Sequence, residues 1–464
     1  MCAFLAPISV KLYSTPNEQL SHNAKQANTM SGNQILGLEI SDLLHDGRGI
    51  GRINGKAYFV EGALPTEAIE FRLIREKRNF GEGRVSKIVS PSGHRVDPRC
   101  EYFSRCGGCT LQHLEHEQQI KYKKQQVLHN LQRIQVQPEN TLPSLIGPKW
   151  HYRRRARLAV QRARDGQFLV GFRNAGTNRI EPISHCLVLD KALDAILTAL
   201  PLILKDLPRD VKISEIELLA ADNALAVSVE ASKSLEKAGE IAVFNALRMV
   251  NDIPTQLWWK SSKKSQFQRI GENDNPLYVR VSDDIKLNCE PGQFIQVNSD
   301  INRRMIDQLL DVLPVGNRGT VVDLFCGSGN LSLPLAQHFD HLVGVEGLKD
   351  LVDGATENAQ SNGIHNVRFI IADLNDAASL KTVSKLAKSI DLVVLDPPRS
   401  GAPAVMSWIN NSGAKRVIYI SCHPATMVRD TTALVQNGYK LKNIGVIDMF
   451  PHTAHIETMA LFEK

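Results

Sequence analysis

The sequence predicts an α/β protein in which an open parallel sheet fills the C-terminal part, a small β-barrel lies near the N-terminus, and a mixed α/β region separates them. Three observations predict this fold. Short runs rich in Val, Ile and Leu alternate with helical segments from about residue 294 onward, glycine-punctuated strands fill residues 34–96, and strands alternate with helices over residues 150–287. The length of 464 residues is enough for about three domains.

The N-terminal region predicts a tail followed by a barrel. The tail reads as polar and unstructured, and Met30 is an alternative start. From Gln34 to Val96 the turns DGRGIG, NGK and NFGEG separate about five short strands. This pattern favours a small barrel of the oligonucleotide-binding type, with a purely structural barrel as the alternative. The expected boundaries are 1–32 for a disordered tail, 33–92 for the barrel, 93–293 for a central domain and 294–464 for the C-terminal domain.

The charge distribution predicts a polyanionic partner. The net charge of +6 is mild, but six arginines lie within residues 153–164 and three lysines within residues 121–124. A bunched basic surface favours nucleic acid, because neutralised phosphates release counterions. A solvated charged face is the alternative.

No segment predicts insertion into a membrane or secretion. No stretch reaches the ~18 apolar residues of a membrane helix, and no secretion signal is recognisable near the start. The eight cysteines therefore read as thiols or metal ligands rather than disulfides. We expect a cytoplasmic monomer that does not associate with membranes.

The C-terminal region predicts a parallel sheet covered by helices. Its short runs are apolar on both faces, as strands buried in such a sheet are. The helical segment KDLVDGATENAQSNG closes on Gly363, as a C-cap would. Ligands bind at the carboxyl ends of strands in such sheets. The predicted strands are GTVVDLF, HLVGVE, VRFIIAD, DLVVLD and RVIYIS.

The first strand–helix turn of this region predicts a nucleotide-like ligand. The arrangement D-x-x-x-G-x-G begins at Asp323, and Glu346 closes the next strand, where it fits ribose hydroxyls. A nicotinamide dinucleotide is the alternative, but Ser332 replaces the last glycine of its fingerprint. Asp373 closes a third strand, where an adenine amino group could be met. The pattern favours S-adenosylmethionine as the ligand. A single acid after a strand usually caps a helix, but three acids at successive strand ends favour a ligand site.

The fourth strand ends in Asp396-Pro-Pro, which resembles the acid-Pro-Pro turn of methyltransferases that act on planar nitrogen heterocycles. The prolines hold the carboxylate in a rigid turn. Enzymes that methylate amino groups typically carry an aromatic residue after the prolines, whereas Arg399 stands here. That difference argues against nitrogen methylation.

Cys422 follows the fifth strand, and its place at the carboxyl edge favours a nucleophile over a buried packing residue or a metal ligand. Carbon 5 of uracil takes a methyl group only after a thiolate adds to carbon 6 and creates an enolate. A base must then remove the carbon-5 proton. Glu457, in an apolar segment, is the candidate, because partial burial raises a carboxyl pKa. His452 and His455 are alternative candidates for the base. The alternative for Glu457 is a place on an exposed strand without a catalytic role.

Cys100, Cys106 and Cys109 form a local triad that lacks one ligand, for which Cys186 is the best remaining candidate. Four thiolates hold either zinc or a [4Fe–4S] cluster. The three-plus-one spacing leans toward iron–sulfur. A polar helix is expected over residues 112–134, with an apolar stripe facing a neighbouring domain.

Taken together, these motifs resemble the bacterial RNA uracil-C5 methyltransferase family, in the branch that acts on 23S ribosomal RNA and carries a TRAM barrel and an iron–sulfur cluster. The likeness runs from about Gln34 to the end of the chain. It implies a Rossmann-like S-adenosylmethionine-dependent methyltransferase domain, a [4Fe–4S] cluster on the four cysteines above, Cys422 as the nucleophile and Glu457 as the base. The implied methyl-donor contacts are Gln296, Phe325, Asn330, Glu346, Asp373 and Asp396.

The sequence departs from this family at His423, where asparagine usually follows the nucleophile, so a side-chain role for that neighbour is in doubt. The transfer RNA branch, which lacks the barrel and the cysteine cluster, is the near rival. A nucleic-acid nitrogen methyltransferase is a more distant rival, and so is a non-catalytic iron–sulfur protein that binds RNA.

Overall fold

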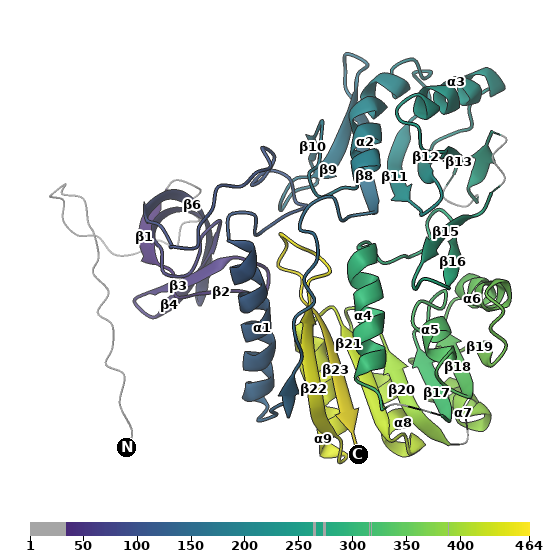
Figure 1. Ribbon diagram of the computed structural model, residues 1–464. Helices are drawn as coiled ribbons and strands as arrows, with labels where there is room; N and C mark the ends of the chain where they lie inside the picture. The colour runs from purple at the N-terminus through teal and green to yellow at the C-terminus, as the bar shows by residue number, and fades with distance from the viewer. Residues whose placement is uncertain (1–33, 263–265, 272–274, 315, 317, 388) are drawn as a thin grey trace. The chain divides into compact units, whose positions relative to one another are not determined.

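A computed structural model describes residues 34–464, apart from residues 263–265, 272–274, 315, 317 and 388 (Figure 1). The tail predicted over residues 1–32 therefore lies outside the described residues. Contacts divide the chain into two compact units, one of Met1–Arg99 with Cys109–Gln119 and the other of Cys100–Gly108 with Ile120–Lys464. Among the described residues, no helix combines the length and apolar character needed to cross a membrane.

The first unit is a curled antiparallel-rich sheet with the strand order β1-β5-β6-β4-β3-β2. Strand β3 approaches β1 so closely that a Cβ on Gly51 would lie 2.2 Å from the Glu39 carbonyl oxygen. The sheet therefore wraps around a core that includes Val60 and Phe71. The glycine turns of the sequence separate these strands as predicted. The strands are β1 (Ile35–Glu39), β2 (Asp42–Leu43), β3 (Gly49–Ile53), β4 (Lys56–Glu61), β5 (Ala68–Glu76) and β6 (Phe80–Ser90).

The second unit begins with a mixed sheet in the order β10-β9-β8-β11-β12-β13-β14. Helix α2 packs on it through leucines and isoleucines at helical spacing, from Leu193 to Leu204, and Asp190 caps the helix by accepting from the Ala192 N–H. The elements are β8 (Arg155–Arg162), β9 (Phe168–Arg173), β10 (Ile180–Pro182), α2 (Lys191–Leu204), β11 (Ile213–Ala220), β12 (Leu225–Ala231), α3 (Lys237–Arg248), β13 (Thr255–Lys260) and β14 (Gln268–Ile270), followed by the hairpin β15 (Leu277–Arg280) and β16 (Lys286–Cys289).

The larger sheet of the second unit has the order β19-β18-β17-β20-β21-β23-β22-β7. Strands β17 to β21 are parallel, and the order reverses between β17 and β20, while β23 runs antiparallel to both its neighbours. The five strands predicted from the apolar runs are confirmed. The strands are β7 (Asn140–Thr141), β17 (Thr320–Leu324), β18 (His341–Glu346), β19 (Val367–Ile371), β20 (Ile390–Leu395), β21 (Arg416–Ser421), β22 (Lys440–Ile447) and β23 (Glu457–Glu463).

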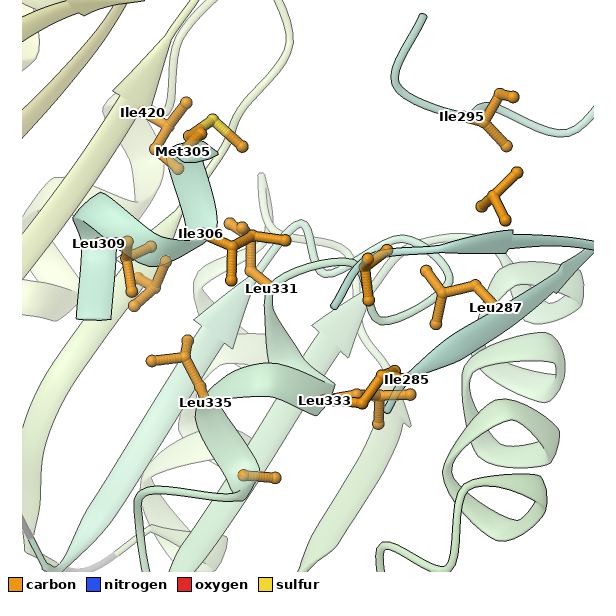
Figure 2. Close-up of a cluster of buried hydrophobic side chains, with 14 of the residues drawn as sticks. Ile285, Leu287, Ile295, Met305, Ile306, Leu309, Leu331, Leu333, Leu335 and Ile420 are labelled. Atoms are coloured by element: carbon orange, nitrogen blue, oxygen red, sulfur yellow. The ribbon is translucent and has the colours of Figure 1, made fainter. Parts of the chain in front are cut away.

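Helices cover both faces of this sheet (Figure 1). Because side chains alternate along a strand, Val321 joins the core on one face and Val322 the core on the other. Figure 2 shows the first of these cores, with Met305 of α4 beside Ile420 of β21. Gly363 ends α6 with a φ of +66°, as the sequence predicts. The helices are α4 (Ser299–Asp311), α5 (Ser332–Ala336), α6 (Lys349–Ser361), α7 (Ala377–Leu386), α8 (Pro403–Ser412) and α9 (Pro424–Gln436).

Helix α1 (His116–Arg133) starts four residues later than the predicted start at residue 112. The Gln119 side chain donates to the Leu111 and Leu114 carbonyls, which stabilises a turn where the helix was expected. Further along, Val127 and Leu131 belong to the same buried cluster as Val446 of β22. The apolar stripe of the helix is therefore buried.

Candidate active site

A cavity of about 340 Å³ lies at the carboxyl ends of the parallel strands, where the strand order reverses. Its volume is typical of small-ligand sites. Five of the residues predicted to contact a methyl donor line it, and they come from segments spread over a hundred positions of the chain. They are Gln296, Phe325, Asn330, Glu346 and Asp396.

The glycine turn after β17 forms one wall of the cavity. Gly327 and Gly329 have positive φ values of 55° and 96°, and Phe325 has a φ of 64°. A bulky residue rarely adopts that conformation, so the turn holds strain of the kind found at ligand sites. The Gly327 N–H donates to the Glu346 carboxylate at 3.2 Å, which fixes this acid beside the turn.

Acidic side chains concentrate around this wall. Asp323 is buried and accepts a hydrogen bond from the Ser332 hydroxyl. Burial raises the pKa of Asp323 to about 7, and the charges of Asp396 and Glu346 act in the same direction. Desolvated carboxyls with raised pKa values gain from a cation. The wall is thus suited to a positively charged ligand such as a sulfonium.

Asn330 is held by a reciprocal pair of amide hydrogen bonds with Asn302 of α4, at 2.8 and 3.0 Å. Asn302, Arg154 and the mostly exposed Phe294 also line the cavity, and none of the three was predicted from the sequence. No local motif marks them. Only Phe294 could have been predicted to line the cavity, because it lies two residues before the predicted contact Gln296 in the same short segment.

Asp373 is not among the residues that line the cavity. Its side chain is exposed and accepts hydrogen bonds from the backbone and side-chain nitrogens of Asn375. The Asp373 side chain thus stabilises a local turn, whereas Asp376 caps the following helix α7. A contact between Asp373 and the methyl donor stays a prediction.

Cys422 directly follows β21 and precedes α9, and its side chain is half-buried. Burial, followed by the charges of Glu457 and Asp396, raises the pKa of the Cys422 thiol to about 11, against the opposing charge of Arg399. These four groups therefore lie close enough to act on one another. The thiol is neutral near pH 7 in the absence of ligands.

Glu457 reaches the site because β23 pairs with β21 in the register Ser421 with Thr458. Its carboxyl is buried, and burial together with the charge of Asp396 raises its pKa well above the ordinary range. Burial also raises the pKa of Asp396 to about 7. Two close buried carboxyls favour a state in which one of them keeps a proton.

The turn that carries Asp396 docks on the start of α9. A Cβ on Gly401 would lie 2.6 Å from the Asp430 carboxylate, and its φ is +70°, so only glycine fits there. Asp430 in turn accepts from the Ala402 N–H and the Tyr419 hydroxyl. These bonds hold the turn and the helix together.

The two rival bases have other contacts. His455 Nδ1 lies 3.2 Å from the Arg399 guanidinium, which can only donate, so that nitrogen accepts. The buried His452 ring stacks on Trp150 with ring centres 4.0 Å apart. Neither arrangement excludes proton transfer, but both histidines already have structural roles.

The basic run over residues 153–164 is largely committed to contacts within the second unit. Arg154 pairs with Asp222, while Arg155 and Arg157 share Glu217. The solvated-face alternative is thus wrong for the largely buried Arg154 and Arg155, whereas Arg157 is exposed.

Three of the predicted cluster ligands, Cys100, Cys106 and Cys186, lie in the second unit, whereas Cys109 belongs to the first unit. The Cys106 sulfur accepts from the Gly108 N–H at 3.4 Å, and backbone N–H groups of Val188 and Leu189 act on the Cys186 sulfur. Among the described residues no group of three side chains is close enough to hold a metal. N–H donors like those at Cys106 and Cys186 are also found around metal-bound thiolates.

Comparisons with known proteins cover nearly the whole chain. A family model described as tRNA (Uracil-5-)-methyltransferase matches residues 115–464, and a TRAM domain model matches residues 33–86. The chain is 38% identical to the 23S rRNA (uracil(1939)-C(5))-methyltransferase RlmD of Legionella pneumophila (strain Paris), over 92% of this chain and 96% of that protein. It is 40% identical to the enzyme of the same name from Pseudomonas savastanoi pv. phaseolicola, over 92% of this chain and 93% of that protein.

Solved structures show the same fold. The crystal structure of Pyrococcus abyssi tRNA (uracil-54, C5)-methyltransferase in complex with S-adenosyl-L-homocysteine matches with a TM-score of 0.70. The match covers 92% of this chain and 100% of that chain at 22% sequence identity.

Proposed function

The chain belongs to the tRNA (uracil-5-)-methyltransferase family, and we propose on this basis that it transfers a methyl group from S-adenosylmethionine to carbon 5 of a uridine in 23S ribosomal RNA. The observation that carries the mechanism is the pairing of β23 with β21, which brings the buried Glu457 beside Cys422, while Asp396 of the neighbouring strand end lines the cavity with the glycine turn. A ribosomal RNA substrate is consistent with the cytoplasmic location expected from the sequence.

The methyl donor supplies an electrophilic methyl group on a sulfonium when it is bound. Asp323, Glu346 and Asp396 offer it a negative wall, and Phe325 and Asn330 shape the cavity around it. Gln296 is proposed as a further polar contact on the opposite segment. Asp373 is retained as a proposed contact only through the family resemblance.

The reaction begins at the thiol. The proton of Cys422 leaves, and the thiolate forms a bond to carbon 6 of the uracil, which places an enolate over carbon 5 and carbon 4. Arg399 favours the thiolate by its charge. Because the resting thiol is neutral, its proton has to pass to solvent as the uracil enters, so that Glu457 remains a carboxylate for the carbon-5 proton.

The second half of the reaction releases the product. Carbon 5 takes the methyl group, and the Glu457 carboxylate removes the proton from carbon 5, so that the electron pair re-forms the ring double bond as the thiolate leaves carbon 6. The burial that raises the pKa of Glu457 makes it a stronger base than an exposed glutamate. The target uridine must leave its stack to reach Cys422.

We further propose that Cys100, Cys106, Cys109 and Cys186 hold a [4Fe–4S] cluster, a role supported by the sequence spacing and by the N–H donors around two of the sulfurs. Bound there, it would have a structural role. Iron and sulfide analysis of the anaerobically purified protein tests this. Stoichiometric zinc in place of iron would refute it.

Trapping with 5-fluorouridine tests the covalent mechanism. A 23S fragment that carries 5-fluorouridine should form a stable adduct in the presence of the methyl donor, because fluorine cannot leave carbon 5 as a proton does. The cross-linked peptide should contain Cys422. Cys422→Ala should give no adduct, whereas Cys326→Ala, which removes a buried thiol that lines the cavity, should still give it.

Two outcomes would support different functions. Full turnover by Cys422→Ala would favour a nitrogen-directed methyltransferase. Tight binding of unmodified 23S RNA without any methyl transfer would favour a non-catalytic RNA-binding protein.

A further inference from the structure

His423 lies between the nucleophile and α9, and its side chain caps that helix. The residue has an extended conformation with φ −143° and ψ 105°, and Pro424 occupies the first turn. His423 Nδ1 accepts a hydrogen bond from the Thr426 N–H at 3.4 Å. The ring therefore satisfies a backbone donor that the helix itself leaves without an acceptor.

The cap also joins the two catalytic loops. The Thr426 hydroxyl lies 3.2 Å from the Arg399 carbonyl oxygen, in the turn that carries Asp396, and 3.1 Å from the His423 carbonyl oxygen. On the other side, the His423 N–H donates to the Ser421 hydroxyl at 3.2 Å, immediately before the nucleophile. Thr426 and His423 therefore connect the loop of Cys422 with the acid-Pro-Pro turn.

An imidazole can serve as this acceptor in one protonation state only. Nδ1 has a lone pair when the ring is neutral and carries its proton on Nε2. A protonated ring has N–H groups at both nitrogens, so it cannot accept from Thr426. Its charge would also face the positive end of the α9 dipole.

We infer that His423 is a positioning residue, which holds Cys422 in register with the Asp396 turn only while its ring is neutral. The inference rests on the proposed function. It adds to that function His423 as a group whose protonation stops the reaction. The charged groups on the elements around this junction include Asp396 and Arg399 in the turn, Arg429 and Asp430 on α9 and Glu457 on β23. Arg429 and Asp430 form an ion pair with each other at 2.8 Å.

Asparagine is the informative replacement. Its side-chain oxygen lies at the same position along the side chain as Nδ1 and accepts the same N–H, but it does not titrate. His423→Asn therefore keeps the cap and removes the pH sensitivity. His423→Ala removes both.

The test is the pH dependence of kcat/KM for methylation of a 23S RNA fragment, between about pH 5 and 9. Below about pH 6.5, the ordinary range of imidazole, log kcat/KM of the wild-type enzyme should fall with a slope one proton steeper than that of His423→Asn. At pH 8 His423→Ala should be about fivefold slower than wild type, the factor that corresponds to the ~1 kcal/mol of an N-cap, and His423→Asn should recover most of this loss. His338→Asn, at an exposed histidine of the same domain, should keep the wild-type slope.

Equal acid slopes for wild type and His423→Asn, or equal rates for the Ala and Asn variants at pH 8, would overturn the inference. Thermal unfolding supplies a readout that needs no methylation. The Tm of wild type should fall relative to that of His423→Asn as the pH drops below about 6.5. If that shift occurs without any methyl transfer, the proposed function fails while the cap stands; if the Tm difference is constant with pH, the cap fails.

Discussion

Lys123 and Asp448 form a buried ion pair that anchors the segment leading to Glu457, the proposed catalytic base. The Lys123 Nζ lies 2.7 Å from an Asp448 carboxylate oxygen and 3.2 Å from the Phe450 carbonyl oxygen. Both side chains are almost fully buried, with exposures of 0% and 1%. Asp448 and Phe450 begin the segment that ends at Glu457, so this pair ties α1 to the site.

Replacing Lys123 with methionine leaves the Asp448 carboxylate buried without its cation. At 2.7 Å the attraction is about 6 kcal/mol with an effective dielectric constant of about 20. Part of this is offset by the cost of removing both charges from water. We expect Lys123→Met to lower the free energy of unfolding by about 3–5 kcal/mol.

Urea unfolding followed by circular dichroism measures this change, with Lys121→Met as the matched control. Lys121 is two residues away on the same helix but exposed, so its replacement should cost less than about 0.5 kcal/mol. The double variant Lys123→Met, Asp448→Asn should recover most of the loss, since no charge stays buried. A Lys123→Met protein as stable as Lys121→Met would refute the reasoning.

Three further predictions concern the candidate active site. Glu457→Gln should be inactive but more stable than wild type at pH 8, because a carboxyl with a raised folded-state pKa loses stability as the pH rises above its ordinary range. A gain that does not shrink toward pH 4.5 in thermal melts would contradict this. Gly401→Ala should lose about 1–3 kcal/mol in urea unfolding, because its Cβ meets the Asp430 carboxylate at a positive φ, and unchanged stability would show that the turn relaxes. Asn302→Ala should weaken methyl-donor binding about tenfold in calorimetry by releasing Asn330, while an unchanged Kd would show that the amide pair is not needed.

Much of the fold could be read from the sequence because its signals are local. Parallel strands buried on both faces need continuous apolar runs, and the glycine turn and Asp396-Pro-Pro follow two of these strands directly. Strand ends in a parallel sheet meet at one edge, so the sequence alone is enough to place Phe325, Glu346 and Asp396 in one site. Asp373 also follows a strand, but its side chain turns to Asn375 instead of the cavity, and nothing local distinguishes the two cases.

The residues that sequence reasoning missed depend on contacts between distant segments. Arg154 comes from the mixed sheet and Asn302 from α4, and each reaches the cavity because its element packs beside the glycine turn. The cap at His423 was also out of reach, since a histidine before a proline has no fixed donor until the helix begins and presents the Thr426 N–H.

The sequence by itself determined the strand–helix alternation, the glycine and proline turns and the place of Cys422 at the end of a strand, because each of these depends on neighbours a few positions away. Tertiary structure alone decided which charges surround that thiol. Strand β23 inserts antiparallel beside β21 and brings Glu457 next to Cys422, and burial of the pair moves both pKa values upward. Desolvation and charge proximity are properties of the packed chain, so no local pattern of residues encodes them.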